Sequence, residues 1–272
     1  MQPPLTFLVF RRPCVLVDRA ASVWYHEGKG VEDMEPILEV TGLYKRYPGF
    51  ALEQVSFSVR PGTVMGLIGR NGAGKTTTIR SILRLVHPDA GTVRLLGQNI
   101  AENERALRQA LGYAAGGTVC YPRRRVGEIA AVTARFFENW DEGRYQSLLE
   151  RFALDPGKRL AELSEGMKRK FSLALAMSHH ARLLLLDEPT SGLDPVSREE
   201  LLDIFRQLAG DGTAIVFSTH ITTDLERCAD EITYLKQGRV VASKEKAAFL
   251  ADYPGCATLD DVMLRLERKE DA

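Results

Sequence analysis

An excess of charge of either sign is missing from this sequence of 272 residues, because 36 Lys and Arg residues balance 36 Asp and Glu residues. A neutral chain has no overall basic field with which to hold nucleic acid or anionic lipid, so no nucleic-acid partner is expected. Cysteine is also scarce. The four cysteines form no CxxC pair and cannot supply a disulfide framework for a chain of this length, which favours the reducing cytoplasm.

Long apolar runs are absent as well. The longest candidate, residues 5–17, is interrupted by Arg11 and Arg12, and no run approaches the roughly 18 apolar residues that span a bilayer. The charges lie inside this apolar stretch and not before it, which disfavours a secretory signal. We therefore expect a chain that does not itself cross a membrane.

Regular patterning begins near residue 37. Residues 1–35 have no sustained period of 2 or 3.6, and we interpret them as a tail that is either disordered or the product of an upstream start choice, with Met34 as the alternative start. Beyond them, short apolar strands at 64–68, 183–186 and 214–218 alternate with helical patterns at 75–86, 196–209 and 224–229. Such alternation predicts an α/β fold with a mostly parallel central sheet.

A glycine-rich segment directly follows the predicted strand at 64–68 and precedes the predicted helix at 75–86. Residues 69–76 match the phosphate-loop pattern GxxxxGK[ST]. The candidate phosphate-binding residues are Gly69, Asn71, Gly72, Ala73, Gly74, Lys75 and Thr76, together with Thr77, which follows the pattern. Glycines let successive backbone N–H groups point at phosphate oxygens, and the helix N-terminus adds positive partial charge. We predict that Lys75 contacts the β- and γ-phosphates of ATP and that the Thr76 hydroxyl is a ligand of Mg²⁺.

Two adjacent acids, Asp187 and Glu188, end the apolar strand at 183–186. In isolation such a pair is usually a solvated loop. Ligands of parallel α/β sheets bind at the carboxyl ends of the strands, so beside a phosphate loop the pair acquires a chemical role. We predict Asp187 as a Mg²⁺ ligand and Glu188 as the catalytic carboxylate that orients and polarises the attacking water.

The order of further motifs carries a family resemblance. Residues 163–167 read Leu-Ser-Glu-Gly-Met, residues 187–194 read Asp-Glu-Pro-Thr-Ser-Gly-Leu-Asp, and residues 218–220 read Ser-Thr-His. Over about residues 37–265 the chain resembles the nucleotide-binding subunit of ATP-binding cassette (ABC) transporters. The resemblance implies a phosphate-loop ATPase that works as a head-to-tail dimer, either with itself or with a paralogous cassette, and holds two ATP molecules at the seam.

The resemblance also implies a division of the chain. A catalytic lobe would comprise residues 36–117 and 181–243, with an antiparallel β subdomain, and a helical lobe with the signature motif would comprise residues 118–180. Residues 244–272 would form a C-terminal helical tail.

The resemblance also implies roles for single residues. In the family pattern Ser164 and the Gly166 amide complete the site of the opposite subunit, Asp194 lies at the seam and His220 contacts the γ-phosphate. Tyr47 would stack on adenine, with Tyr44 as the competing candidate.

Residues 139–168 look similar to ATPases of exporter systems related to bacitracin resistance and acetoin use. The implied partner is a separate transmembrane permease, which would hold the chain peripherally on the inner face of the cell membrane. Arg123, Arg124 and Arg125 lie where family cassettes meet the permease, although a solvated basic turn explains them equally well.

The sequence departs from the family at three positions. Gly116 stands where a Gln or an acid is usual, and the loss of a hydrogen bond of about 1.5–3 kcal/mol would slow hydrolysis roughly 10- to 100-fold. Glu165 and Met167 replace the usual glycine and glutamine of the signature. Two rival functions therefore stay open, a regulatory ATP-binding cassette with little hydrolysis and a cassette that acts outside transport.

Overall fold

The computed structural model describes residues 35–115 and 121–268, and of residue 268 only the backbone. The chain divides into two units, Met1–Met34 and Glu35–Ala272, and the first lies outside the described residues. The predictions for the N-terminal tail and for Gly116 therefore concern residues that the structure does not describe. In the part that is described, no helix is both long and apolar enough to cross a membrane.

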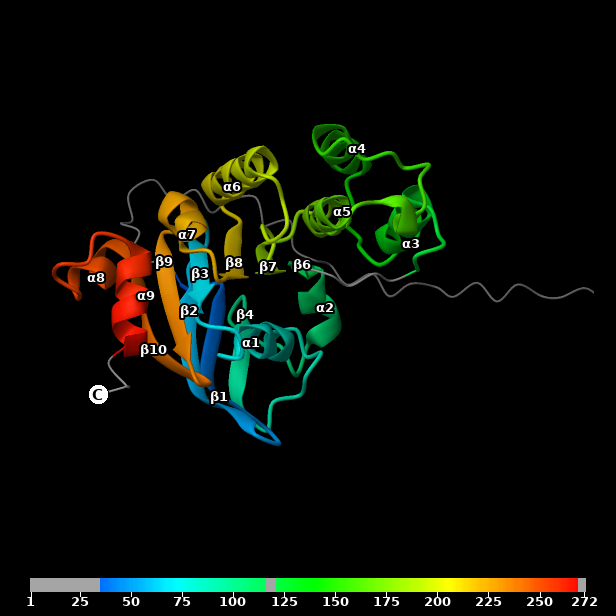
Figure 1. Ribbon diagram of the computed structural model, residues 1–272. Coiled ribbons are helices and arrows are strands. Elements are labelled where there is room, and N and C mark those ends of the chain that lie inside the picture. The colour runs from blue at the N-terminus through cyan, green and yellow to red at the C-terminus, as the bar shows by residue number, and fades with distance from the viewer. Residues whose placement is uncertain (1–34, 116–120, 269–272) are drawn as a thin grey trace, which may run out of the picture. The chain divides into compact units, whose positions relative to one another are not determined.

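A six-stranded sheet organises the fold, in the order β10-β9-β3-β8-β7-β6 (Figure 1). All neighbouring pairs are parallel except β10 and β9, which form an antiparallel hairpin. The strands are β3 Val64–Ile68, β6 Leu111–Ala115, β7 Leu183–Asp187, β8 Ala214–Thr219, β9 Glu231–Lys236 and β10 Arg239–Glu245. The predicted mostly parallel sheet is confirmed.

The two faces of this sheet belong to two hydrophobic clusters. Leu184 and Leu186 of β7 pack into the cluster that contains the helices between residues 126 and 177 and helix α6 (Pro195–Gly210). Leu183 and Leu185 pack into the cluster that contains helix α1 (Lys75–Ile82) and the second sheet. Alternate residues of a strand point to opposite faces, so an all-leucine strand is buried on both sides. This double burial holds the carboxyl end of β7, where Asp187 lies, in a defined position.

The second sheet is antiparallel, in the order β2-β1-β4-β5, and includes the long hairpin near the N-terminus of the described chain (Figure 1). Its strands are β1 Leu38–Tyr47, β2 Phe50–Val59, β4 Ala90–Leu95 and β5 Gln98–Asn99. Its apolar residues share a cluster with Ile79 and Ile82 of α1. The predicted antiparallel β subdomain is thereby confirmed.

The three helices predicted at 75–86, 196–209 and 224–229 are present with shifted ends, and further helices lie between and after them. They are α1 Lys75–Ile82, α2 Glu104–Arg108, α3 Val126–Ala134, α4 Glu142–Arg151, α5 Glu165–Met177, α6 Pro195–Gly210, α7 Thr222–Cys228, α8 Lys246–Ala251 and α9 Leu259–Arg268, with a 3-10 turn at Leu160–Glu162. The prediction that the first helix continues to residue 86 is wrong. Arg84 adopts a left-handed φ of 55°, and the amides of Leu85 and Val86 both turn back to the Arg80 carbonyl, which ends the helix.

Candidate functional site

The glycine-rich loop lies between the end of β3 and the start of α1. Gly69 has a φ of 152° and Gly74 a φ of 109°, conformations that L side chains rarely adopt. A Cβ at Gly69 would lie 2.2 Å from the Leu235 carbonyl oxygen, so only glycine lets β9 approach the loop this closely. The Gly238 amide also donates to the Ala73 carbonyl at 3.0 Å, so the β9–β10 turn supports the loop, a contact that the sequence analysis did not find.

Lys75 closes the loop on itself. Its Nζ donates to the Gly69 carbonyl at 2.7 Å and to the Arg70 carbonyl at 3.2 Å, and the residue is 6% exposed. Burial lowers the pKa of the ammonium, while the carboxylates of Glu188 and Asp187 act in the opposite direction. The charge is therefore held in a poorly solvated position where an anionic ligand would interact with it strongly.

Asp187 joins the loop to the neighbouring strand. Its Oδ1 accepts from the Thr76 hydroxyl at 3.1 Å and from the Ser218 hydroxyl at 2.6 Å. Asp187 and Ser218 are register partners on the parallel strands β7 and β8, and the 218–220 motif did not by itself predict this contact of Ser218. Among the described residues no cluster of three or more His, Cys, Asp or Glu could hold a metal by itself. The carboxylate and the hydroxyl nevertheless form the oxygen donor set that suits Mg²⁺, which keeps water and phosphate ligands as well.

Glu188 and His220 form a pair at the ends of the same two strands. His220 Nδ1 lies 2.9 Å from Glu188 Oε2, and the Glu188 amide donates to the Ser218 hydroxyl oxygen at 3.1 Å. Glu188 adopts a φ of 53°, which is uncommon for a residue with a long side chain. Strain of this kind persists where surrounding contacts enforce it, and it is frequent at functional sites.

A buried cluster behind this pair was missed by the sequence analysis. The Asp224 carboxylate, which is 1% exposed, accepts from the Thr190 hydroxyl at 2.6 Å and pairs with Arg198. The cluster ties the segment after Glu188 to α6 and to α7, the helix that follows His220. Thr190 lies in the 187–194 motif, but Arg198 and Asp224 belong to no motif, and Asp224 is 26 residues or more from the other two, so only the fold brings the three together.

Ser164, Gly166 and Asp194 form a second group, at the N-termini of α5 and α6. Ser164 Oγ accepts from the Met167 amide at 3.2 Å, and Asp194 Oδ1 accepts from the Ser197 amide at 3.0 Å, so both are helix caps. Hydrogen bonds with Ser197 lower the pKa of Asp194. Within the described residues no hydrogen bond joins this group to the glycine-rich loop.

The predicted adenine-stacking residue, Tyr47, ends β1 and is 38% exposed. Its ring lies 6.5 Å from that of Phe50, between centroids, in a stacked orientation. Phe50 reaches the loop, because a Cβ at Gly74 would lie 3.1 Å from its ring. Tyr44 is half-buried. The choice of Tyr47 stays a prediction, and Phe50 joins it as a neighbour that the sequence analysis did not identify.

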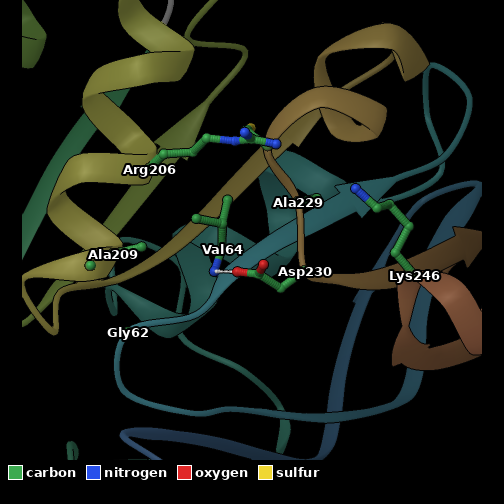
Figure 2. A pocket seen from close by; sticks show the side chains of 9 residues that line it. Gly62, Val64, Arg206, Ala209, Ala229, Asp230 and Lys246 are labelled. Carbon is green, nitrogen blue, oxygen red and sulfur yellow. Dashed lines mark hydrogen bonds between the residues drawn. The ribbon is translucent and has the colours of Figure 1, made fainter.

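A cavity of about 340 Å³ lies at the opposite, amino edge of the sheet (Figure 2). Its lining contains none of the predicted site residues; Arg206, Cys228, Asp230 and Lys246 are its members with reactive or charged side chains. Asp230 accepts from the Val64 amide at 2.9 Å, and Lys246 donates to the Glu226 carbonyl at 2.8 Å. Both groups therefore bond the backbone at this edge.

The chain matches the family model described as ABC transporter over residues 52–191. It is 34% identical over 229 residues to the Nod factor export ATP-binding protein I of Burkholderia orbicola strain AU 1054, with 82% of this chain and 75% of that protein covered. It is 36% identical over 211 residues to the protein of the same name from Rhizobium etli, with 76% and 67% covered.

Solved structures agree with these relatives. A structure described as the ATP binding subunit of an ABC transporter superposes with a TM-score of 0.78 at 31% identity and covers 85% of this chain and 99% of its own. A nucleotide-free ATP-binding cassette from an ABC transporter superposes with a TM-score of 0.67 at 20% identity, with 81% and 96% covered, and supports the fold alone.

Proposed function

The chain belongs to the ABC transporter family as an ATP-binding subunit, and from that premise we propose that MgATP binds at residues 69–77 and is hydrolysed with Glu188 as the catalytic carboxylate. Subunits of this family hydrolyse ATP to power a separate permease. The observation that carries the assignment is one hydrogen-bonded series at the carboxyl edge of the sheet, in which Thr76, Asp187, Ser218, Glu188 and His220 follow one another.

Binding of the nucleotide depends on the loop and on Lys75. Phosphate oxygens would replace the Gly69 and Arg70 carbonyls as acceptors of the Lys75 ammonium, and the free amides at the start of α1 would donate as well. Asn71, Gly72, Ala73 and Thr77 complete the proposed phosphate contacts. Thr76 and Asp187 would hold Mg²⁺, which supplies charge neutralisation at the phosphates when it is bound.

Glu188 and His220 have different roles in hydrolysis. The Glu188 carboxylate orients a water molecule and takes up its proton, a contribution typically worth 10²- to 10⁴-fold in rate. The ring of His220 holds that carboxylate in place from the end of the neighbouring strand. The Asp224 cluster keeps the segment after Glu188 rigid, because Thr190 and Arg198 both bind the buried acid.

The exposed caps Ser164 and Asp194 and the half-exposed Gly166 support a dimer. Because these residues do not bond the chain's own loop, we assign them to the nucleotide of a second copy or of a paralogous cassette. Two chains in head-to-tail contact would place the N-terminus of α5 from one protomer over the phosphates held by the other, where its dipole favours negative charge.

The partner in the membrane is a separate permease. The names of the relatives indicate export, and we assign that direction to this chain. Three exposed arginines directly precede α3: Arg123, Arg124 and Arg125. We assign them to contact with the permease, which would place the chain at the inner face of the membrane. The transported substrate is selected by the permease.

Single-turnover hydrolysis by purified protein tests the proposal. Glu188→Gln should hydrolyse MgATP at least about 100-fold more slowly than the unsubstituted protein while still binding it, because only the proton acceptor is lost. Equal rates in the two proteins would contradict the catalytic assignment and favour a regulatory cassette.

Co-purification of the tagged chain with a multi-span membrane protein tests the assignment of a permease partner. If the chain is isolated without such a protein under gentle detergent conditions, the result would favour a function outside transport.

A further inference from the structure

The C-terminal helix α9 is fastened at its start to the helix that follows the catalytic pair. The Asp260 carboxylate accepts from the Thr222 hydroxyl at 2.6 Å, and the Leu259 amide donates to the Glu226 carboxylate at 2.7 Å. Thr222 and Glu226 belong to α7, which begins two residues after His220. These bonds hold α9 in place beside the candidate site.

The other end of α9 lies at the carboxyl edge of the sheet. The Tyr234 hydroxyl donates to Glu267 Oε1 at 2.8 Å, and Lys236 Nζ donates to the Leu266 carbonyl at 2.9 Å. Tyr234 is buried in β9 and is the register partner of Ile68, the last residue of β3 before the glycine-rich loop. Because α9 lies alongside β9 (Figure 1), it brings Glu267 next to that loop.

Glu267 meets the glycine-rich loop through Arg70. Arg70 Nη1 lies 3.6 Å from Glu267 Oε2, and within the described residues the guanidinium has no other ion pair. The Arg70 carbonyl accepts from Lys75 Nζ at 3.2 Å, so Arg70 belongs to the part of the loop that closes on the buried ammonium. An acid of the C-terminal helix is thus paired with a cation of the segment to which we assign the phosphates.

The two members of this pair are held unequally. The side chain of Arg70 is 76% exposed, whereas that of Glu267 is 22% exposed and is also fixed by the buried Tyr234. An ion pair with one such exposed member is weak and is screened by salt. Arg70 can therefore leave Glu267 for a ligand with more negative charge, and the carboxylate keeps its hydrogen bond to Tyr234 when it does.

On the basis of the proposed function, we propose that Glu267 is a positioning residue that lowers the affinity of the loop for ATP, because it holds the guanidinium of Arg70 away from the phosphates. When ATP binds, the guanidinium exchanges the carboxylate for phosphate oxygens, to which an arginine can donate two parallel hydrogen bonds. The C-terminal helix thereby sets the ATP concentration at which the chain is loaded.

Equilibrium binding of MgATP tests the proposal in the Glu188→Gln background, in which turnover should be slow. Glu267→Gln keeps an acceptor for Tyr234 and removes the charge, so it should lower the Kd about threefold, the effect of one exposed ion pair. Glu245→Gln is the matched control, because Glu245 is 65% exposed and lies 3.2 Å from Arg60 at the amino edge of the sheet. It should leave the Kd unchanged. An unchanged or higher Kd for Glu267→Gln, or an equal decrease in both variants, would overturn the proposal.

A double-mutant cycle tests whether Glu267 acts through Arg70. Arg70→Gln should raise the Kd for MgATP about threefold, because the released guanidinium no longer reaches the phosphates. In that background the additional Glu267→Gln should leave the Kd unchanged. The same decrease with and without Arg70 would mean that the carboxylate repels the phosphates directly, and would overturn the proposal.

The salt dependence separates this role from support of the fold. The difference in Kd between Glu267→Gln and its parent should disappear as ionic strength rises toward about 1 M, where the Debye length is about 3 Å. A difference that salt does not change would assign Glu267 to the packing of α9 and overturn the proposal. A parent that binds MgATP while every variant binds it equally well would overturn this inference alone. A parent that binds no MgATP would overturn the proposed function as well.

Discussion

At the carboxyl edge of the central sheet, the side chains of Asp187 and Ser218 bond each other, as do those of Glu188 and His220. At the amino edge, Asp230 and Lys246 bond a backbone amide and a backbone carbonyl. Both edges are charged, and a cavity of about 340 Å³ lies at the amino edge (Figure 2). The difference lies in what the polar groups are paired with. At the amino edge the bonded backbone belongs to the ends of regular elements, Val64 of β3 and Glu226 of α7. At the carboxyl edge the side chains bond one another or, for Lys75, the carbonyls of the glycine-rich loop, and these bonds can be exchanged for a ligand.

The largest effect is expected at the carboxyl edge, from Lys75→Met. Loss of the buried ammonium should weaken MgATP binding about 100-fold, the upper range for a hydrogen bond to a charged group. Equilibrium binding of a fluorescent ATP analogue measures this effect. Retained affinity would show that the loop amides alone hold the phosphates. The carboxyl edge would then not differ from the amino edge in the effect of its charged side chains on nucleotide affinity.

The same variant changes the pH dependence of stability. Burial lowers the pKa of Lys75 in the folded state, so between that pKa and the ordinary lysine pKa the unfolded chain binds more protons. Stability without nucleotide should therefore rise with pH in this alkaline window, and Lys75→Met should remove that part of the rise. Urea unfolding across the alkaline range provides the measurement, with Lys158→Met as a control at an exposed lysine.

At the amino edge, we expect Asp230→Ala to lower the stability moderately and to leave the nucleotide affinity unchanged. The substitution leaves the Val64 amide without its acceptor at the start of β3, which costs about 1–2 kcal/mol of unfolding free energy. Asp230→Asn keeps an acceptor oxygen and should lose less. Weaker ATP binding by folded Asp230→Ala protein would show that the two edges of the sheet are coupled.

The smallest effect concerns Cys228, which lines the cavity at the amino edge. Burial raises the pKa of its thiol to about 12, so at pH 8 roughly one thiol in ten thousand is ionised. We expect Cys228 to react with iodoacetamide at least about tenfold more slowly than the half-buried Cys256, as measured by peptide mass spectrometry. Comparable rates would mean that the cavity opens in solution and is accessible to ligands.

The fold class and half of the candidate site follow from local sequence. The glycine loop, its position between an apolar strand and a helix, and the acids after the leucine strand are read from a few neighbouring residues, since backbone conformation and strand burial act over short distances. Helix ends are less predictable, as Leu85 and Val86 show. Their apolar spacing suits a helix, but a left-handed Arg84 ends it first.

What the sequence determined by itself is therefore the set of chemical groups and their order along the chain. Only the tertiary structure decided which of them meet: that Ser218 bonds Asp187, that Asp224 holds the segment after Glu188, and that Glu267 pairs with Arg70. The physical reason is the strand order β3-β8-β7, which makes neighbours of loop ends far apart in the chain. No short-range pattern records such contacts, because they arise from burial of whole strands and helices.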